Sequence, residues 1–519
     1  MAHVQFRSSW FRWCRKLLVL GLFALSAAFG TPGAVAQEVG DRLQPATYFD
    51  SPAQWHQISF ESPDSSELDM VLRRLRETEL RLESLEKDQS ARISDDGDLD
   101  IHSASYQAGK KDAKDGDKKK EAPKEKKWFE NYSLRGYAQF RYNYITHTAP
   151  GSDGPQYAGD GSIGPDQEFL IRRARLIFTG NISDHLRVYL QPDFASTPDA
   201  STSSIQFAQI RDWYGDVFLD KEQVHRFRVG QSKVPYGWEN LQSSQNRLFL
   251  DRNDAFNSAV RNERDLGVFY YWTPEWATDL YKILVDENLK GSGNYGLFGI
   301  GVYNGEGGSF RELNDNLHFI ARMTWPWVTD DGKVYEVGVQ GYTGQYVVRG
   351  TNIARLGAGG ATQLPGGTQS GNIVPEGTVD KRIGWTFIKY PQPFGVQAEW
   401  TIGEGPALNA AQSAIETRSL WGGYVGANYK LDTHCWGTIF PYARYQAFQG
   451  GYKSANNSPY STISECDMGV EWQIRKEVEL VTEYVFTDRT NLNSVNQSGV
   501  RSYGQFEGQV LRFQLQVNY

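Results

Sequence analysis

The sequence predicts an all-β protein: a 16-stranded antiparallel transmembrane β-barrel, preceded by a short N-terminal coiled-coil helix and a disordered linker. From residue 128 onward, apolar and polar residues alternate in many short segments, as in strands with one lipid face and one water face. Aromatic residues make up 13% of the chain and glycines number 52, which suits interfacial girdles and tight strand packing. Short and long connections alternate between the segments, which is the outer-membrane arrangement.

Residues 1–36 have the features of a secretory signal peptide. An apolar run, Leu17–Phe29, is followed by the small-residue cleavage site Ala34-Val35-Ala36. The basic region before the run contains Arg7, Arg12, Arg15 and Lys16. Cleavage removes these four basic residues and no acidic ones, so the formal charge changes from −8 to −12. Net charge therefore gives no reason to expect anion binding.

Cleavage of the signal would also remove Cys14 and leave Cys435 and Cys466. We expect the first in a turn at one barrel end and the second in a strand near the other end. That separation exceeds the roughly 7 Å limit between bridged Cα atoms. The sequence therefore predicts no intrachain disulfide.

The region between the signal and the barrel divides into three parts. Residues 37–63 are irregular, residues 64–90 form a coiled coil, and residues 91–127 form a charged disordered linker. The a and d positions of the coil are Leu68, Val71, Leu75, Thr78, Leu82 and Leu85. Because a lone helix of this length is marginal in water, a partner is implied. The partner is the same helix in another copy or another part of this chain. No aromatic residues interleave with the linker lysines, so we expect a solvated tether and no nucleic acid.

Residues 128–519 contain sixteen strand candidates. They begin near positions 132, 168, 185, 204, 224, 264, 294, 316, 334, 381, 394, 418, 438, 461, 478 and 505. Long connections are expected at Thr146–Gln167, Val234–Glu263, Val348–Asp380 and Arg489–Gly504. Glu275–Gly293 could be a further strand, but one more strand would break the even count. We therefore interpret it as a periplasmic insertion, with both barrel ends and the coil on the short-turn, periplasmic side.

One long irregular connection, Val234–Glu263, lies between two short strands. A loop of this length is unusual in a compact soluble domain, whereas inside a wide barrel it can fold into the lumen and narrow the pore. An ordinary polar surface loop is the alternative. The basic residues in or beside this connection are Lys233, Arg247, Arg252, Arg261 and Arg264.

Arginines also lie on the predicted water face of neighbouring strands. They are Arg135, Arg141, Arg173, Arg175, Arg187 and Arg512. Guanidinium groups bind phosphate or carboxylate through paired hydrogen bonds, and rings of them make pores anion-selective. The alternative is that these arginines pair with lumen carboxylates, because Glu399, Glu479 and Glu483 fall on the same face.

No catalytic constellation is visible. The eight histidines are scattered without a metal-binding spacing, and the chain contains neither a nucleophile elbow nor a phosphate-binding loop. We therefore expect no enzyme activity, no catalytic or metal-binding residues and no cofactor.

The barrel region resembles the phosphate-selective porin O and P family. The segments that carry the resemblance are LRGYAQFRYNY, FLIRRARLIFTG, LRVYLQPDFA, VGQSKVPYGWENLQSS, RDLGV, VYNGEG and VQAEW, over Trp128–Tyr519. The resemblance implies a trimeric sixteen-stranded barrel with its third loop folded inward. It also matches Arg172 and Arg173 to a basic pair in the family's pore, and the stretch from Lys233 to Arg252 to the constriction.

Two positions depart from the family pattern. Tyr137 stands where characterised members place a pore arginine in the first strand. The fifth loop, Val348–Asp380, holds only Arg349 and Arg355 in place of a spaced arginine ladder. From the resemblance we expect an outer-membrane porin of a Gram-negative-type bacterium, which passes small hydrophilic solutes and prefers anions, with phosphate as a candidate. The alternatives are a non-selective porin and an envelope tether anchored by the barrel, with the coil contacting the cell wall or a periplasmic partner.

Overall fold

The structure is a computed structural model. It describes residues 128–152, 154–155, 163, 168–195, 208–308, 310–349, 353–354, 361–362, 376–410, 414–433, 435–455, 457–495 and 501–519. The predicted signal peptide, irregular segment, coiled coil and linker lie outside the described residues, so these assignments stay predictions.

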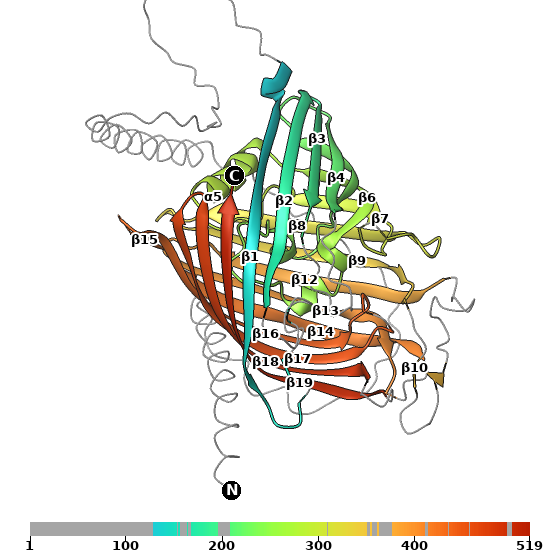
Figure 1. The fold of residues 1–519 in the computed structure, drawn as a ribbon. Helices are drawn as coiled ribbons and strands as arrows, with labels where there is room; N and C mark the ends of the chain where they lie inside the picture. The colour runs from blue at the N-terminus through green and yellow to red at the C-terminus, as the bar shows by residue number, and fades with distance from the viewer. Residues whose placement is uncertain are drawn as a thin grey trace, which may run out of the picture. The chain divides into compact units, whose positions relative to one another are not determined.

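The described part of the chain forms a closed antiparallel β-barrel (Figure 1). A short turn of helix, η1 (Trp128–Asn131), leads into β1. The strands are β1 (Tyr132–Thr148), β2 (Glu168–Ser183), β3 (Leu186–Asp193), β4 (Gln209–Phe218), β5 (His225–Lys233), β6 (Arg264–Trp272), β7 (Phe298–Tyr303), β8 (His318–Val328), β9 (Val334–Tyr346), β12 (Thr378–Lys389), β13 (Phe394–Leu408), β14 (Ile415–Tyr429), β15 (Leu431–Thr433), β16 (Gly437–Gly451), β17 (Tyr460–Arg475), β18 (Val478–Val495) and β19 (Arg501–Asn518). The short β15 continues β14, and both pair with β16. Counted with β14 and β15 as one strand, the barrel therefore has sixteen strands in the described residues, as predicted.

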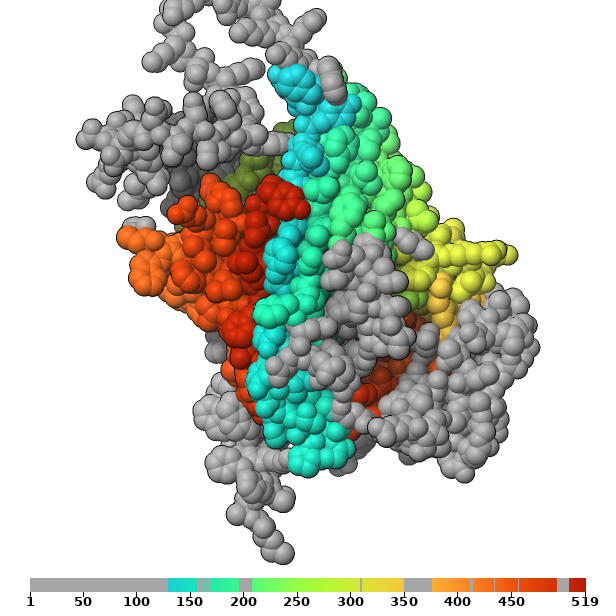
Figure 2. Space-filling view, in the orientation of Figure 1, coloured from blue at the N-terminus to red at the C-terminus, as the bar shows by residue number. Residues whose placement is uncertain are grey.

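The first and last strands close the barrel. β1 pairs with β2 on one side and with β19 on the other. The backbone N–H of Gly136 donates to the carbonyl of Tyr519 at 2.6 Å, and the N–H of Tyr519 donates back at 2.9 Å. Figure 2 shows this seam, with the blue first strand beside the red last strand. These two bonds extend the pairing of β1 with β19 to residue 519.

The predicted alternation of faces is confirmed. In β1, Leu134 and Phe140 are exposed, whereas Tyr137, Gln139 and Arg141 are buried in the lumen. The predicted strand starts agree with the structure within five residues, the largest difference being position 204 against Gln209. The outward apolar side chains are what a lipid-facing surface requires, because hydrocarbon cannot hydrate polar groups.

One predicted loop is wrong. The long connection expected at Arg489–Gly504 is mostly strand, because β18 extends to Val495 and pairs there with Arg501 in β19. The segment is rich in Asn, Ser and Thr, which reads as loop. Strand ends that extend beyond the apolar layer need no apolar face, so hydrogen bonding between the strands is sufficient there.

The segment Glu275–Gly293 is an insertion, as predicted, and not an additional strand. It forms the helix α5 (Glu275–Asp286) followed by an irregular stretch that leads into β7. Figure 1 draws α5 at the end of the barrel where the C-terminus lies. Both features therefore belong to the short-turn side.

The remaining small elements are α3 (Trp238–Leu241), α4 (Asp254–Asn257) and η2 (Arg261–Glu263) between β5 and β6, and a hairpin of β10 (Ile353–Ala354) with β11 (Ala361–Thr362). None of the described helices combines the length and the apolar character that crossing a membrane demands. No disulfide joins Cys435 and Cys466, as expected.

Candidate functional site: a passage beside an inward-folded loop

The connection between β5 and β6, residues 234–263, is folded into the barrel; we call it loop L3. Its apolar side chains are fully buried, including Tyr236, Trp238, Phe249 and Phe256. They pack against aromatic residues that point inward from the far wall, for example Tyr342 and Tyr424. This burial fixes L3 across the lumen, and the prediction of an inward loop is confirmed.

Charged side chains of the wall bind L3 at its first turn. Glu399 on β13 accepts hydrogen bonds from the backbone N–H groups of Trp238 and Glu239, at 2.6 and 2.9 Å. Arg444 on β16 donates to the Glu239 carboxylate at 2.9 Å and to the Asp251 carbonyl at 2.8 Å. Buried polar groups need such partners, so these contacts specify where the loop lies.

The second half of L3 is held by arginines from the wall. Arg141 and Arg512, on β1 and β19, pair with Asp251. Arg489 on β18 pairs with Asp254 at 2.9 Å. Arg382 on β12 donates to the Ala255 carbonyl at 2.9 Å. L3 is therefore attached to the β12–β19 side of the lumen and to β1.

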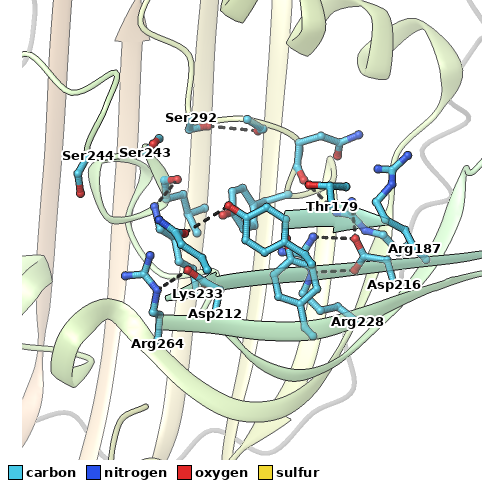
Figure 3. A pocket seen from close by; sticks show the side chains of 18 of the residues that line it. Thr179, Arg187, Asp212, Asp216, Arg228, Lys233, Ser243, Ser244, Arg264 and Ser292 are labelled. Carbon is cyan, nitrogen blue, oxygen red and sulfur yellow. Dashed lines mark hydrogen bonds and ion pairs between the residues drawn. The ribbon is translucent and has the colours of Figure 1, made fainter. Parts of the chain in front are cut away.

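A cavity of about 340 Å³ remains between L3 and the opposite wall, formed by β1–β6; we call it the passage. Its lining residues are Arg135, Arg175, Thr179, Arg187, Tyr189, Gln191, Asp212, Tyr214, Asp216, Arg226, Arg228, Lys233, Leu241, Ser243, Ser244, Arg264, Ser292, Gly293, Asn294 and Tyr295. Seven of these side chains are basic and two are acidic. Figure 3 shows several of them pointing into the same space from the sheet and from the loops.

Both acidic residues of the passage are ion-paired. Arg228 holds Asp216 through two parallel hydrogen bonds of 2.8 and 2.9 Å, and Figure 3 draws the two side by side. Arg264 donates to Asp212 at 2.9 Å. The acids therefore offer little charge to a cation that enters the passage.

Two other guanidinium groups in the passage have no carboxylate partner among the described residues. Arg135 donates to the amide oxygen of Gln245 at 3.2 Å. Arg187 donates to the amide oxygens of Asn181 and Gln223, at 2.7 and 3.3 Å. Amide oxygens are neutral, so both positive charges remain available to a passing anion.

Tyrosine rings order the passage arginines. The Arg228 guanidinium lies 3.8 Å from the centroid of Tyr214, which stacks on Tyr189 at 5.0 Å. Arg226 lies 4.8 Å from the ring of Tyr271. Cation–π contacts of this kind fix the orientation of a guanidinium without neutralising it.

Within L3, Glu263 and Arg247 keep their charges at neutral pH. Burial opposes ionisation of Glu263, but Arg252, Arg264 and Arg211 hold its pKa well below the ordinary value. Burial and the neighbouring Arg252 lower the pKa of Arg247 to about 10. L3 therefore contributes at least one negative and one positive charge to the lumen.

Four of the eleven residues predicted from the sequence line the passage. They are Arg135, Arg175, Lys233 and Arg264. Lys233 also donates to the carbonyls of Leu241 and Gln242, at 2.9 and 2.6 Å, and so closes the C-terminal end of α3.

The other seven predicted residues do not line the passage. Arg141 and Arg512 anchor Asp251, while Arg252 pairs with Glu263 inside L3. Arg247 donates to two carbonyls of L3, and Arg261 stacks on Phe310 at 3.7 Å. The last two are Arg173 and Arg172. Arg173 donates to Gln139, and Arg172 lies at a β-bulge in the pairing of β1 with β2. The alternative interpretation was that lumen arginines pair with carboxylates. The structure shows such ion pairs for Arg141, Arg175, Arg252, Arg264 and Arg512.

The site predicted from sequence missed several passage residues. Arg226 and Arg228 alternate with Phe227 and Val229 in β5, so the period-two rule already placed both arginines on the water face. Asp212, Tyr214 and Asp216 follow the same rule in β4. By contrast, Asn294 and Tyr295 belong to the irregular insertion, where no periodicity could have found them.

The two departures from the family pattern can be placed. Tyr137 is buried in the lumen, and its hydroxyl accepts a hydrogen bond of 2.8 Å from Arg175. Arg349 lies 4.5 Å from the Phe310 ring and 3.8 Å from Glu306, outside the passage. Arg355 lies outside the described residues. In the part of the chain that the structure describes, no group of three or more His, Cys, Asp or Glu could hold a metal ion.

These features define the class of protein. A closed antiparallel barrel with an apolar outer surface, a charged lumen and a loop folded across it is a porin, a channel for small solutes in the outer membrane of Gram-negative bacteria. A sequence profile of the phosphate-selective porin O and P family matches residues 149–519, and the chain belongs to this family.

Similar solved structures are also outer-membrane proteins. OmpT of Vibrio cholerae, in a trimer form, is 11% identical, with 75% of this chain and 99% of that chain covered and a TM-score of 0.43. The outer-membrane channel DcaP of Acinetobacter baumannii is 14% identical, with 75% and 97% covered and a TM-score of 0.43. Salmonella typhi OmpF, in complex with daunomycin, is 11% identical, with 75% and 97% covered and a TM-score of 0.46. None of the curated proteins matches the sequence.

Proposed function

We propose that this porin prefers anions and that the passage between L3 and β1–β6 is where it selects them. The observation that carries the proposal is the lining, with seven basic side chains against two acidic ones, both of them ion-paired. Low-dielectric walls around a cleft of one charge sign focus its field, which concentrates counter-ions and speeds their entry. An anion therefore meets a lower barrier in this passage than a cation of the same size.

Arg135 and Arg187 act as transient binding sites in this proposal. A channel must bind its ion strongly enough to attract it and weakly enough to release it. Guanidinium groups that bond only to neutral amides can exchange those bonds for a passing anion. Inorganic phosphate fits this chemistry, because its oxygens accept the paired hydrogen bonds that a guanidinium donates.

The test is the reversal potential of the purified protein in planar bilayers under a salt gradient. Arg135→Gln together with Arg187→Gln should shift the reversal potential toward the cation side and weaken any block of chloride current by phosphate. Lys381→Gln is the matched control, since it removes one positive charge from the outward face of β12, where the side chain is 53% exposed. An unchanged reversal potential in the double variant would remove the proposed role of these arginines.

A non-selective porin is the second candidate. It is favoured by the pairing of Arg175, Arg228 and Arg264 with carboxylates, which reduces the field that a solute meets. The same recording separates the two, because a non-selective channel shows a reversal potential near zero and no phosphate block. An envelope tether would give no conductance at all.

The assembly and the N-terminal region complete the proposal. The family resemblance supports a homotrimer embedded in outer-membrane lipid, and a three-stranded coil at residues 64–90 would match that symmetry. The linker, residues 91–127, would then let the coil reach the cell wall or a periplasmic partner.

A further inference from the structure

The insertion between β6 and β7, residues 273–297, crosses the lumen at the short-turn end of the barrel. α5 buries Ala277, Leu280 and Tyr281 in a cluster with residues of β9 and β12. Beyond the helix, Lys290 reaches β17 on the other side, where it forms a buried ion pair with Glu471. The chain then returns to β5, and Arg226 donates to the carbonyl of Asn294 at 2.9 Å. The insertion thus contacts the wall at three well-separated places.

The insertion and L3 form one packed obstacle. Trp238 of L3 lies in the same apolar cluster as Leu284 and Leu289 of the insertion. Gln242 of L3 donates to the carbonyl of Lys290 at 2.5 Å. Because the two segments enter from opposite ends of the barrel and meet in its interior, solutes cannot pass between them. The open route lies where both contribute to the lining of the passage.

The wall behind this obstacle differs in charge from the wall of the passage. Among the strand side chains that the structure describes, the buried charged ones in β1–β6 are seven basic and four acidic: Arg141, Arg173, Arg175, Arg226, Arg228, Lys233 and Arg264 against Asp193, Asp212, Asp216 and Asp265. In β7–β19 they are four basic and eight acidic: Arg322, Arg382, Arg444 and Arg512 against Glu336, Asp380, Glu399, Glu465, Asp467, Glu471, Glu479 and Glu483. The lumen therefore has a basic side and an acidic side.

L3 and the insertion cover different parts of the acidic side. L3 donates two backbone hydrogen bonds to Glu399 and one to Glu483, the latter from the N–H of Leu250. The insertion covers Glu471, on which the ammonium group of Lys290 is placed, with Lys290 also 4.7 Å from the Phe440 ring. Without the insertion, the carboxylates nearest the short-turn end would face the water of the pore.

We propose that the β6–β7 insertion determines ion selectivity by covering the acidic side of the lumen. The ion pair between Lys290 and Glu471 holds the insertion against that side. This inference rests on the proposed anion preference. The insertion leaves solutes only the route along the basic side, and it forms part of that route through Ser292, Asn294 and Tyr295. Covering carboxylates has the same effect on selectivity as removing them, because a buried, paired charge contributes little field to the pore.

The first test removes the insertion from the full-length protein. Trp272 and Phe298 are paired residues of β6 and β7, so a short Gly-rich turn can join them in place of residues 273–297. Single-channel conductance should rise because a second route opens, and the reversal potential should shift toward the cation side because that route is acidic. Unchanged conductance and reversal potential would overturn the proposal.

Point variants test the same inference with the fold preserved. Lys290→Gln leaves Glu471 without its ion-pair partner, with only the hydrogen bond from Gln473, and the anion preference should fall. Adding Glu471→Gln to that variant should restore the preference, because the uncovered charge is gone. Lys282→Gln is the matched control. Lys282 lies on the exposed face of α5, where its side chain is 61% exposed and pairs with Asp286. This variant should change neither the conductance nor the reversal potential. If Lys290→Gln behaves like Lys282→Gln, the ion pair between Lys290 and Glu471 does not hold the insertion against the acidic side.

The two proposals fail separately. A wild-type channel without anion preference contradicts the proposed function. The rise in conductance on removal of the insertion is measured independently of that preference, and its absence contradicts the covering role alone.

Discussion

Arg444 is the wall residue whose loss should most directly release L3. Its side chain is buried and donates to Glu239 at 2.9 Å, to the Asp251 carbonyl at 2.8 Å and to Asp467 at 2.7 Å. One guanidinium thus ties two points of the loop to one carboxylate of β17. We expect Arg444→Met to leave a folded barrel in which L3 leaves its docked position far more often.

The magnitude follows from the burial of the partners. Removing one member of a buried ion pair costs about 3–5 kcal/mol, since the remaining charge stays desolvated. Glu239 keeps hydrogen bonds from the backbone and side-chain N–H groups of Asn253, so the lower value applies. A loss of about 3 kcal/mol shifts the docked-to-undocked ratio of L3 by roughly two orders of magnitude.

Two measurements report that shift. Single-channel recordings of Arg444→Met should show frequent changes of conductance level that the wild type lacks, and limited proteolysis should cut within residues 234–263. Combining Arg444→Met with Glu239→Gln and Asp467→Asn removes the uncompensated charges and should recover part of the docking. If the Arg444→Met channel shows no additional conductance levels and resists proteolysis within residues 234–263, this network does not position L3.

Two further predictions concern pH and the N-terminal region. Burial raises the pKa of Glu306 from the ordinary 4.5 to about 7, so the folded protein retains a proton that the unfolded chain releases earlier. The free energy of unfolding should therefore fall as pH rises from about 4.5 to 7. Glu306→Gln should make the thermal-unfolding temperature less dependent on pH in that range. If the variant shows the same pH dependence as the wild type, Glu306 is not its source. Deleting residues 68–85 should leave a barrel of wild-type conductance but weaken trimers on non-denaturing gels or abolish a periplasmic contact. Loss of neither would contradict the coiled-coil interpretation.

Much of the fold follows from the sequence because one physical constraint repeats in every strand. Lipid outside and water inside impose a period of two, so the alternation by itself assigns Leu134 and Arg141 to opposite faces of β1. The exceptions occur where the constraint is absent. The ends of β18 and β19 extend beyond the apolar layer, and their polar residues resemble a loop.

The helix α5 could also have been predicted from the sequence. Its buried residues Ala277, Leu280, Tyr281 and Leu284 are spaced by three and four, which is helical spacing. The segment DLYKILVD is short and apolar enough to suggest a strand, and short apolar runs do not separate the two structures.

The site was less predictable than the fold, for a reason that Arg141 and Arg187 illustrate. Alternation assigns both to the lumen but does not say which carboxylate or amide each one meets. Arg141 meets Asp251 because L3 takes a particular irregular path, whereas Arg187 donates hydrogen bonds only to neutral amide oxygens. That path depends on non-local packing of Trp238 and Phe249, which no periodic pattern encodes.

The seam between β1 and β19 also constrains how the protein is made. Gln139 and Gln516 are hydrogen-bonded across it although 377 residues separate them in the chain. During synthesis the edge of β1 on this side stays unpaired until β19 has been made. Such edges recruit other chains, and contacts this distant in sequence form slowly. The barrel can therefore close only after β19 has been made, because β19 supplies the second partner of β1.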